Sequence, residues 1–474
     1  MSNKKNIALI GFPGDYFHEF ALSLQSVGFN IYWVCTTDSM FEGLKRRQGV
    51  KKEFLINLFQ DFNPETMDIN ISRFYLSNLE SPNYPTFNDI ILMDRILRKK
   101  NTVIAIKFLN HIAVKLEYFF KENHIQLINS GRDSAIQLTS MLVAKKMNIK
   151  WVVPTRMRIP KNMYGFCSTH ETNSFIKISK PDSNDYDWAD KFLTKYLYED
   201  IKPELKVAAM NFFDIFKLIP IHFKIFCIRF KESILDLNNT YTRYTICDII
   251  TMYFNRRINM LKVIIFKPFE YPELNNPYAL YTLHTQPESS IDVCASFFSN
   301  QIETIKLISR CLPITHELYV KVHPTDVDGK NISFYKSIRE IPSVKLIHYK
   351  CNTTILIEKA DLIFSLTGTA ALESGLRNKK VITFANNFFN VLPTINYCSD
   401  LKELPQLIKK ILYFNPATDN RKKIVEFLAD MKASCFEGEI NRDYGSNPGK
   451  LTHEDLKKLT ISYTVLFNNT NKNL

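Results

Sequence analysis

Short apolar runs alternate along the chain with segments in which apolar residues recur every three or four positions. The first run, 7–11, leads through a Pro-Gly turn into a helical pattern over 17–27, which ends at Gly28 before a second run at 30–35. A buried strand, a helix and a second strand in this order predict a βαβ unit, and therefore a parallel sheet.

The same rhythm returns twice. In the N-terminal half we predict helices at about 104–123 and 134–147, each followed by a short strand, at 125–129 and 150–153. In the C-terminal half, turn residues separate the predicted elements more clearly. It predicts strands at 278–283, 318–322, 344–347, 361–365 and 381–384, with helices at about 297–311, 353–359 and 369–376. Both halves therefore indicate the α/β fold class.

One segment interrupts this rhythm. Residues 201–270 hold eleven Lys or Arg against six Asp or Glu, and the stretch 212–230 is rich in Phe and Ile. Its apolar runs are too short to span a bilayer. It is either an interfacial segment on an anionic membrane or a pair of helices packed on the sheets. We divide the chain into an N-terminal domain (1–200), this segment (201–270), a C-terminal domain (271–420) and terminal helices with a tail (421–474).

Composition narrows the class of protein. The 474 residues carry a formal net charge of +13, but no concentrated Lys/Arg block indicates nucleic-acid binding. No two of the nine cysteines have CxxC spacing, which argues against a zinc ribbon and a disulfide framework. The first apolar run is too short for a signal peptide, so we expect a cytoplasmic protein with reduced thiols.

Polar residues follow three of the predicted C-terminal strands. Because ligands bind at the carboxyl ends of strands in open α/β sheets, these residues are candidates for one site. They are His284, Gln286 and Glu288 after the first strand, His323 after the second, and Ser365, Thr367 and Thr369 after the fourth.

The Ser365–Thr369 turn, which contains Gly368, precedes a helix and has the features of an anion site. Unpaired helical N–H groups and the helix dipole attract a phosphate there, and glycine lets the backbone approach it. A simple N-cap is the alternative. Glu373 lies one turn further on the same helix face as Thr369, where it reaches a ribose or sugar hydroxyl.

His323 and Glu288 are the candidate reactive groups of this half. Pro324 fixes the backbone after His323, so that the imidazole donates to a phosphate or a glycosidic oxygen. Glu288 is placed to act as a general base, a nucleophile or a ribose ligand. The alternatives are a structural histidine and a surface glutamate.

On the N-terminal side, charged residues follow two predicted strands. Asp133 is the second candidate for the catalytic base. Each of the others is either a site residue or a solvated loop charge. Asp15, His18 and Glu19 are further acid/base candidates, and Arg132, Arg156 and Arg158 are candidates to hold an acidic sugar. The spacing of Gly11 and Gly14 does not match the dinucleotide fingerprint GxGxxG.

Four motifs in order carry a resemblance to a known family. Over residues 281–384 the chain resembles the bacterial capsule polysaccharide and lipopolysaccharide biosynthesis family that includes the Kdo transferases. The matching motifs are His284-Thr285-Gln286-Pro287-Glu288, a helix from Gln301 to Pro313 with a modified spacing, Lys321-Val322-His323-Pro324, and Ser365 to Glu373 with Thr367-Gly368-Thr369 inside it.

The resemblance implies a GT-B glycosyltransferase, with two Rossmann-like domains facing a cleft and the nucleotide on the C-terminal one. The segment is also similar to bacterial sialyltransferases that pair a His-Pro motif with a Ser/Thr motif around CMP. That similarity implies that His323 and the 365–369 turn bind the CMP phosphate and that Glu373 binds the ribose. It implies neither a metal ion nor another cofactor. With it, the binding residues we expect are His284, Gln286, His323, Pro324, Ser365, Thr367, Gly368, Thr369 and Glu373.

We therefore expect a glycosyltransferase that moves an acidic ulosonic sugar such as Kdo from a CMP-sugar to an anionic glycan or glycolipid. We expect it to work at the inner face of the cell membrane, with peripheral contact to anionic lipid and without nucleic acid as a partner. Two alternatives stay open. One is a UDP-sugar transferase or epimerase on the same fold, and the other is a non-catalytic subunit of capsule assembly or export.

Overall fold

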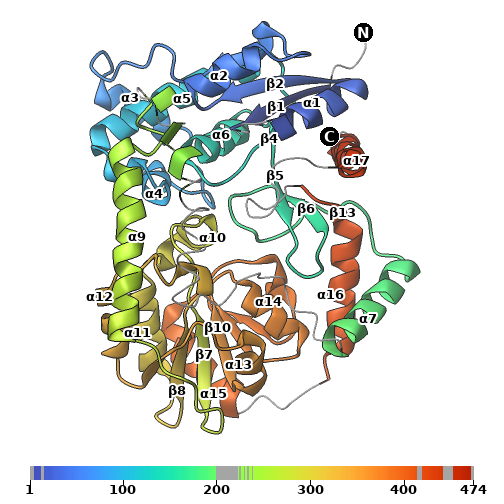
Figure 1. The fold of residues 1–474 in the computed structure, drawn as a ribbon. Coiled ribbons are helices and arrows are strands. Elements are labelled where there is room, and N and C mark those ends of the chain that lie inside the picture. The colour runs from blue at the N-terminus through green and yellow to red at the C-terminus, as the bar shows by residue number, and fades with distance from the viewer. Residues whose placement is uncertain are drawn as a thin grey trace.

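The chain folds into two α/β units, drawn one above the other in Figure 1. We describe them from a computed structural model. The described residues are 5–11, 15–198, 223, 226–228, 230–231, 234–236, 239–413, 419–440 and 452–470. Most of the Phe- and Ile-rich stretch 212–230 lies outside the described residues.

The first unit is built on a seven-stranded sheet with the order β13-β6-β5-β4-β1-β2-β3. Strands β3, β2, β1, β4 and β5 are parallel, whereas β6 and β13 add antiparallel pairs at one edge. The apolar run 7–10 at the centre is fully buried, as expected of a strand with both faces covered. The strands are β1 (Lys5–Ile10), β2 (Phe29–Cys35), β3 (Leu55–Asn57), β4 (Leu127–Asn129), β5 (Lys150–Arg156), β6 (Met163–Cys167) and β13 (Phe436–Glu437).

Local signals set the ends of the helices in this unit. Thr37, Asn101 and Ser134 accept backbone N–H groups as N-caps, and Gly28 takes a φ of 92° just after the first helix. The helices are α1 (Asp15–Ser26), α2 (Asp38–Lys45), α3 (Ile69–Ser77), α4 (Phe87–Met93), α5 (Thr102–Glu122) and α6 (Ala135–Lys146).

The second unit is built on a six-stranded parallel sheet with the order β12-β11-β10-β7-β8-β9. The chain winds outward from β7 to β9, then returns to β10 beside β7 and continues to the other edge. This is the Rossmann strand order, and its switch point lies between β7 and β10. The strands are β7 (Tyr278–Thr282), β8 (Glu317–Lys321), β9 (Val344–Ile347), β10 (Leu362–Ser365), β11 (Val381–Thr383) and β12 (Ile395–Tyr397).

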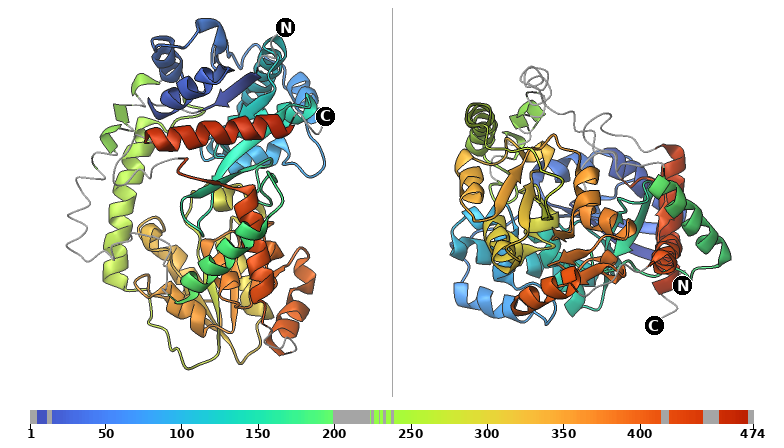
Figure 2. Two further views of the ribbon diagram at one scale, coloured as in Figure 1. Left: turned by 90° about the vertical axis from the view of Figure 1, so that its right-hand side faces the viewer. Right: turned by 90° about the horizontal axis from the view of Figure 1, so that it is seen from below.

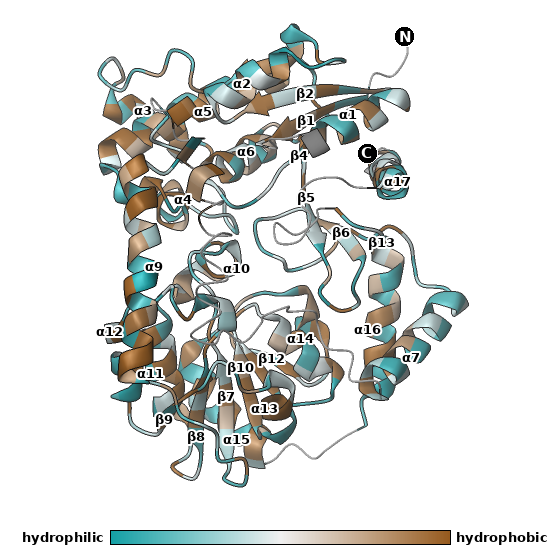
Figure 3. Cartoon of the chain, in the orientation of Figure 1, coloured by the Kyte–Doolittle hydropathy of each residue, from teal (hydrophilic) through white to brown (hydrophobic). Residues whose placement is uncertain are grey.

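Helices flank this second sheet, whose strands are mostly brown, and therefore hydrophobic, in Figure 3. Gly375 lets one helix approach β12 closely, since a Cβ there would lie 2.8 Å from Ile395 and Leu392 side-chain carbons. The helices are α10 (Ser289–Asp292), α11 (Gln301–Cys311), α12 (Ile332–Arg339), α13 (Thr353–Lys359), α14 (Thr369–Leu376) and α15 (Leu404–Tyr413).

Within the described residues, four further helices pack beside the two units. The long helix α9 (Ile246–Phe266) runs beside both, as Figure 2 shows, and begins with a capping box formed by Thr245 and Asp248. Helices α7 (Ser183–Tyr198) and α16 (Arg421–Ser434) pack side by side, and α17 (His453–Thr470) returns to pack on α1 of the first unit.

The α/β fold class and the two Rossmann-type domains are thus confirmed. Most predicted elements differ from the observed ones by one to three residues at their ends. The helix predicted from about 297 is an exception, because it begins only at Gln301, after a short 3-10 turn at Ser296–Phe298. In the described part of the chain, none of the helices has the length and apolar character needed to cross a membrane.

Candidate functional site

Three neighbouring strands bring the C-terminal candidates to one edge of the second sheet. Strands β10, β7 and β8 lie next to one another, and they are parallel. His284 comes shortly after β7, His323 shortly after β8, and Ser365 ends β10. The expected grouping of these residues is therefore observed, and it lies at the switch point between β7 and β10.

His284 is buried against the Ser/Thr turn. A Cβ on Gly368 would lie 3.2 Å from the His284 Cε1 and 3.0 Å from the Ser365 Oγ. His284 is 9% exposed, and its Nε2 has no hydrogen-bond partner among the described residues. Burial lowers the pKa of His284 to about 4, and the nearby His323 adds to this shift. The ring is therefore neutral at pH 7.

Helix α14 begins beside this imidazole. Gly368 is its N-cap residue and supplies no side-chain cap, although its own N–H donates to the Ser365 Oγ at 3.2 Å. The first-turn N–H groups thus receive no acceptor from the N-cap side chain. Together with the helix dipole, such groups favour an anion.

His323 presents a defined ring nitrogen. Its Nδ1 accepts the Thr325 N–H at 3.3 Å and lies 2.7 Å from the Thr325 Oγ1. Because the backbone N–H can only donate, Nδ1 is the acceptor and Nε2 carries the hydrogen of the neutral ring. Burial, followed by the charge of Lys321, lowers the pKa of His323. His323 is therefore a neutral hydrogen-bond donor through Nε2.

Several predicted ligands are engaged within the protein. The Thr367 hydroxyl donates to the Ser290 carbonyl at 2.7 Å, which ties the turn to helix α10. The Glu373 Oε1 accepts from the Thr354 hydroxyl at 3.1 Å and lies 3.6 Å from the Arg377 Nε. The ribose contact of Glu373 stays a prediction, and so do the nucleotide contacts of Thr367, Thr369 and Pro324.

Gln301 organises the loop that carries His284 and Gln286. Its amide accepts the His284 N–H at 2.8 Å and donates to the His284 carbonyl at 2.9 Å and to the Gln286 Oε1 at 3.0 Å. Gln286 in turn donates to Asp292 and to the Ser299 carbonyl. The Gln286 side chain is therefore held in place by hydrogen bonds within the protein. Gln301 positions this loop, whereas the sequence showed it only as the start of a motif.

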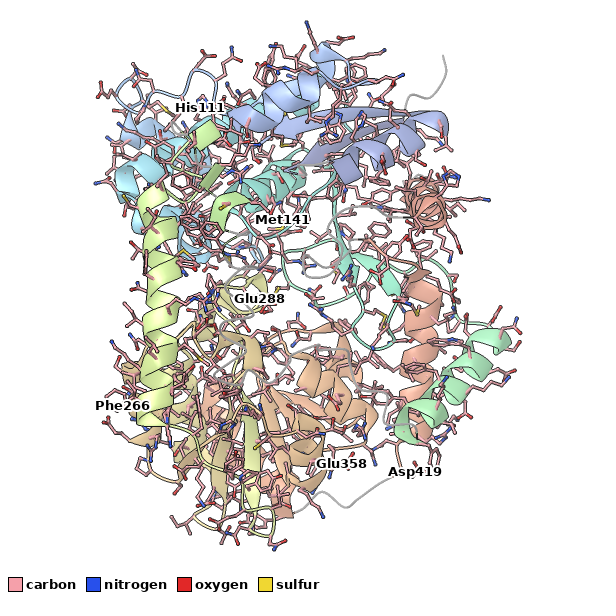
Figure 4. All side chains as sticks on the ribbon, viewed as in Figure 1. His111, Met141, Phe266, Glu288, Glu358 and Asp419 are labelled. Carbon is pink, nitrogen blue, oxygen red and sulfur yellow. The ribbon has the colours of Figure 1, made fainter. Side chains whose placement is uncertain are left out.

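Glu288 is the N-cap residue of α10 and lies in the region between the two sheets (Figure 4). Burial raises the pKa of its carboxyl group, and the negative charge of Asp133 adds to this rise. The charges of Arg158 and Arg95 act in the opposite direction. The two candidate bases, Glu288 and Asp133, are therefore near enough for their charges to interact. Arg95 was missed, because no motif marks the stretch in which it lies.

The other N-terminal candidates have different surroundings. Arg132 is buried and donates to the His170 carbonyl and to the hydroxyls of Thr172 and Thr155, so it binds the protein interior. This corrects its expected role as a ligand for an acidic sugar. Arg156 pairs with Glu439 at 2.7 Å, and His18 Nε2 bonds the Gln48 carbonyl at 2.7 Å. The Asp15 side chain lies outside the described residues, and the role expected of Glu19 stays a prediction. Arg158, by contrast, acts on Glu288 through its charge.

Within the described ranges, no three or more His, Cys, Asp or Glu side chains are grouped so that they could hold a metal ion. The binding groups identified here are instead imidazoles, a hydroxyl and a helix N-terminus. All of them suit an anionic ligand.

Comparison with known proteins gives one family match and several weak likenesses in structure. Thermosulfurimonas dismutans KpsC, a beta Kdo 2,4 transferase, is 10% identical with a TM-score of 0.38, covering 72% of this chain and 87% of that chain. The beta Kdo 2,7 transferase of the same KpsC is 10% identical with a TM-score of 0.32, covering 74% and 89%. Methanocaldococcus jannaschii UDP-GlcNAc 2-epimerase in complex with UDP-GlcNAc and UDP is 14% identical with a TM-score of 0.28, covering 89% and 99%.

All three TM-scores are below 0.5. No curated protein matches the chain. The family match covers residues 263–394, which include the whole β7–β11 segment with His284, Glu288, His323 and the Ser/Thr turn. Over these residues the chain is similar to a family described as capsule polysaccharide biosynthesis protein.

Proposed function

We propose that the chain is a glycosyltransferase of capsule polysaccharide biosynthesis that binds a nucleotide-sugar at the switch point of the second sheet. One observation carries the proposal. The Nε2 of the buried His284 has no hydrogen-bond partner among the described residues. It lies next to Gly368, at the start of helix α14. A phosphate oxygen at this point accepts hydrogen bonds from the helix N–H groups and from whichever imidazole nitrogens carry hydrogens.

The donor we propose is a CMP-linked acidic sugar, on the strength of the resemblance of the His-Pro and Ser/Thr motifs. The leaving group is then a nucleoside monophosphate, whose charge grows as the glycosidic bond breaks. The Nε2–H of His323 and the N-terminus of α14 stabilise that charge, so the transfer needs no metal ion. Glu288 or Asp133 takes the proton of the acceptor hydroxyl.

We further propose that the enzyme contacts an anionic membrane through α9. Five apolar residues of this helix are exposed at intervals of three or four positions, which places them on one face. They are Ile250, Phe254, Ile258, Leu261 and Ile265. Arg257 and Lys262 lie on the same helix, and such a combination suits a lipid surface with acidic headgroups. Peripheral contact would bring a glycolipid acceptor to the enzyme.

A panel of nucleotides and nucleotide-sugars tests the proposal. CMP, UMP, CMP-Kdo, CMP-sialic acid and UDP-GlcNAc are titrated into the full chain by calorimetry, and release of the nucleotide is followed with and without EDTA. We expect CMP compounds to bind more tightly than UMP compounds, with turnover unchanged by EDTA. Preference for uridine would favour the UDP-sugar alternative. Absence of binding to every compound would contradict the proposal and favour a non-catalytic subunit.

A further inference from the structure

A cavity of about 500 Å³ lies beside the β5–β6 edge of the first sheet, where helices α7 and α17 approach it. One wall is helix α7, a second is β13 with the start of α17, and a third is the β5–β6 loop. It is separate from the His284 region. The residues that carry the argument are Arg158, Trp188, Phe192, Tyr196, Glu437 and Glu439.

The wall on α7 is a ladder of aromatic rings. Trp188, Phe192 and Tyr196 are four residues apart, so they stack along one helix face. The ring centroids of Trp188 and Phe192 are 5.4 Å apart with an interplanar angle of 12°, and those of Phe192 and Tyr196 are 6.0 Å apart at 19°. The Nζ of Lys432 lies 5.1 Å from the Trp188 ring centroid and holds the end of the ladder.

The opposite rim carries charged groups that are already fixed by protein partners. Glu437 pairs with Lys432, and Glu439 pairs with Arg156 at 2.7 Å. Three acidic and three basic side chains line the cavity, so it has no strong preference for an anion such as a nucleotide. Rigid aromatic surface opposite oriented donors and acceptors is the chemistry that recognises a pyranose ring, which has apolar C–H faces and an equatorial belt of hydroxyls.

Arg158 connects the cavity with the candidate catalytic site. It lines the cavity, and its positive charge also acts on the Glu288 carboxyl group, where it opposes the rise in pKa that burial causes. Arg158 thus belongs to the cavity lining and also lies near enough to Glu288 for their charges to interact. A guanidinium at that point is also a partner for the carboxylate of an acidic sugar.

We propose that this cavity is the binding site for the acceptor glycan, in which pyranose rings pack on Trp188 and Phe192 while the rim groups bind their hydroxyls. The growing end of the glycan then lies near Glu288, opposite the nucleotide-sugar. This inference rests on the proposed transferase function, since it assigns the acceptor of that reaction.

Tryptophan fluorescence tests the site directly. The chain has three tryptophans, of which Trp33 and Trp151 are buried in the first unit, so that the half-buried Trp188 reports on the cavity. The probe is a set of oligosaccharides released from the capsule of the organism that encodes the chain. We expect a saturable change in emission that is lost in Trp188→Phe. Phe192→Ala and Arg158→Ala should each raise the dissociation constant about tenfold or more.

Tyr186→Ala is the matched control, because Tyr186 lies on the same helix and is 41% exposed but does not line the cavity. It should bind the oligosaccharides as the wild type does. Arg158→Ala changes an exposed side chain, so it keeps the test valid if Phe192→Ala does not fold. The CMP affinity of Phe192→Ala should equal that of the wild type.

The two proposals fail in different ways. If CMP binds and sugar is transferred, but the emission does not respond to the oligosaccharides and Phe192→Ala leaves the KM for the acceptor unchanged, the acceptor site is overturned alone. If the emission responds to the oligosaccharides and Phe192→Ala and Arg158→Ala weaken their binding, while no nucleotide binds, the glycan site stands and the transferase proposal is overturned.

Discussion

The imidazole of His284 lies so close to Gly368 that a methyl group at this glycine would be 3.2 Å from the His284 Cε1. The same methyl group would be 3.0 Å from the Ser365 Oγ, which accepts the Gly368 N–H. The strand end of β7 and the turn after β10 are therefore fitted to each other without room for a side chain. This contact defines the floor of the proposed phosphate site.

Gly368→Ala should therefore weaken nucleotide binding without unfolding the chain. The backbone φ of −75° suits alanine, so the expected effect comes from displacement of His284 and Ser365. We expect the dissociation constant for CMP to rise about tenfold, which is ~1.4 kcal/mol, as measured by calorimetry.

Gly43→Ala is the matched control, because a Cβ there meets no atom within 4 Å. It should leave CMP affinity unchanged. Equal affinities of the two variants would show that the contact between His284 and Gly368 does not shape the site.

His323→Ala should weaken nucleotide binding by about 1–3 kcal/mol, the range for a hydrogen bond to a charged group. The loss follows from the removal of the Nε2–H donor that the contact with Thr325 orients. His316→Ala serves as its control, since His316 lies at the opposite end of β8 and contacts Asp361.

Thr367→Ala should also weaken binding, by release of the turn from the Ser290 carbonyl. Calorimetry with CMP measures both variants. Wild-type affinity in both His323→Ala and Thr367→Ala would place the nucleotide elsewhere.

Acid should destabilise the fold through buried histidines. Burial lowers the pKa of both His284 and His170 to about 4, from an ordinary value of 6.5. Below pH 6.5 the unfolded chain binds protons that the folded chain does not. Their contribution is therefore fully present above pH 6.5 and is lost as the pH falls towards 4. Between pH 7.5 and pH 5 each histidine should cost about 2 kcal/mol of unfolding free energy.

Urea unfolding at these two pH values measures the loss in the wild type and in His170→Asn. The variant lacks one of the two groups, so its stability should fall by about 2 kcal/mol less over the same interval. An identical pH dependence in both proteins would mean that His170 is not held neutral by the fold.

The sequence was most informative where hydrophobic pattern and backbone chemistry coincide. The strand at 344–347 and the helix at 353–359 were predicted with the bounds that the structure has, because buried apolar runs alternate there with clear turn residues. The same logic placed His284, His323 and Ser365 at one sheet edge, since parallel strands share a direction.

Long-range contacts could not be predicted in this way. Arg132 was a candidate ligand for an acidic sugar, but it is buried and contacts His170, Thr172 and Cys294, which lie far away in sequence. The aromatic ladder on α7 becomes a cavity wall only because β13 and α17 return to the first unit. No local pattern contains that information.

Substitution of the exposed face of α9 tests the proposed membrane contact. Phe254→Asp and Ile258→Asp place charges on side chains that are 58% and 47% exposed. We expect both to reduce flotation with vesicles that contain phosphatidylglycerol, because burying a carboxylate in the interface is unfavourable. Wild-type binding should weaken with added salt. Phe266, at the lower end of α9 in Figure 4, is exposed as well and offers a third position.

Ile314→Asp is the control for this experiment, since Ile314 is 93% exposed but lies before β8 rather than on α9. It should float as the wild type does. Flotation that ignores lipid charge, or that Phe254→Asp leaves unchanged, would exclude α9 as the contact.

The last prediction concerns the catalytic base. Glu288→Gln keeps the shape of the side chain and removes its charge, so it should slow sugar transfer about a hundredfold or more, the range for loss of a general base. Its affinity for CMP should fall much less than the rate, because the groups we propose for the phosphate are His323 and the α14 N-terminus, not Glu288. Burial raises the pKa of Glu288, so the base becomes protonated at a higher pH than an exposed glutamate would. As the pH is lowered, the wild-type rate should therefore begin to fall earlier than it would with an exposed glutamate as the base. Steady-state kinetics across this pH range measure both effects. If Asp133→Asn slows transfer and Glu288→Gln does not, the base is Asp133, and if neither does, the base is a different group.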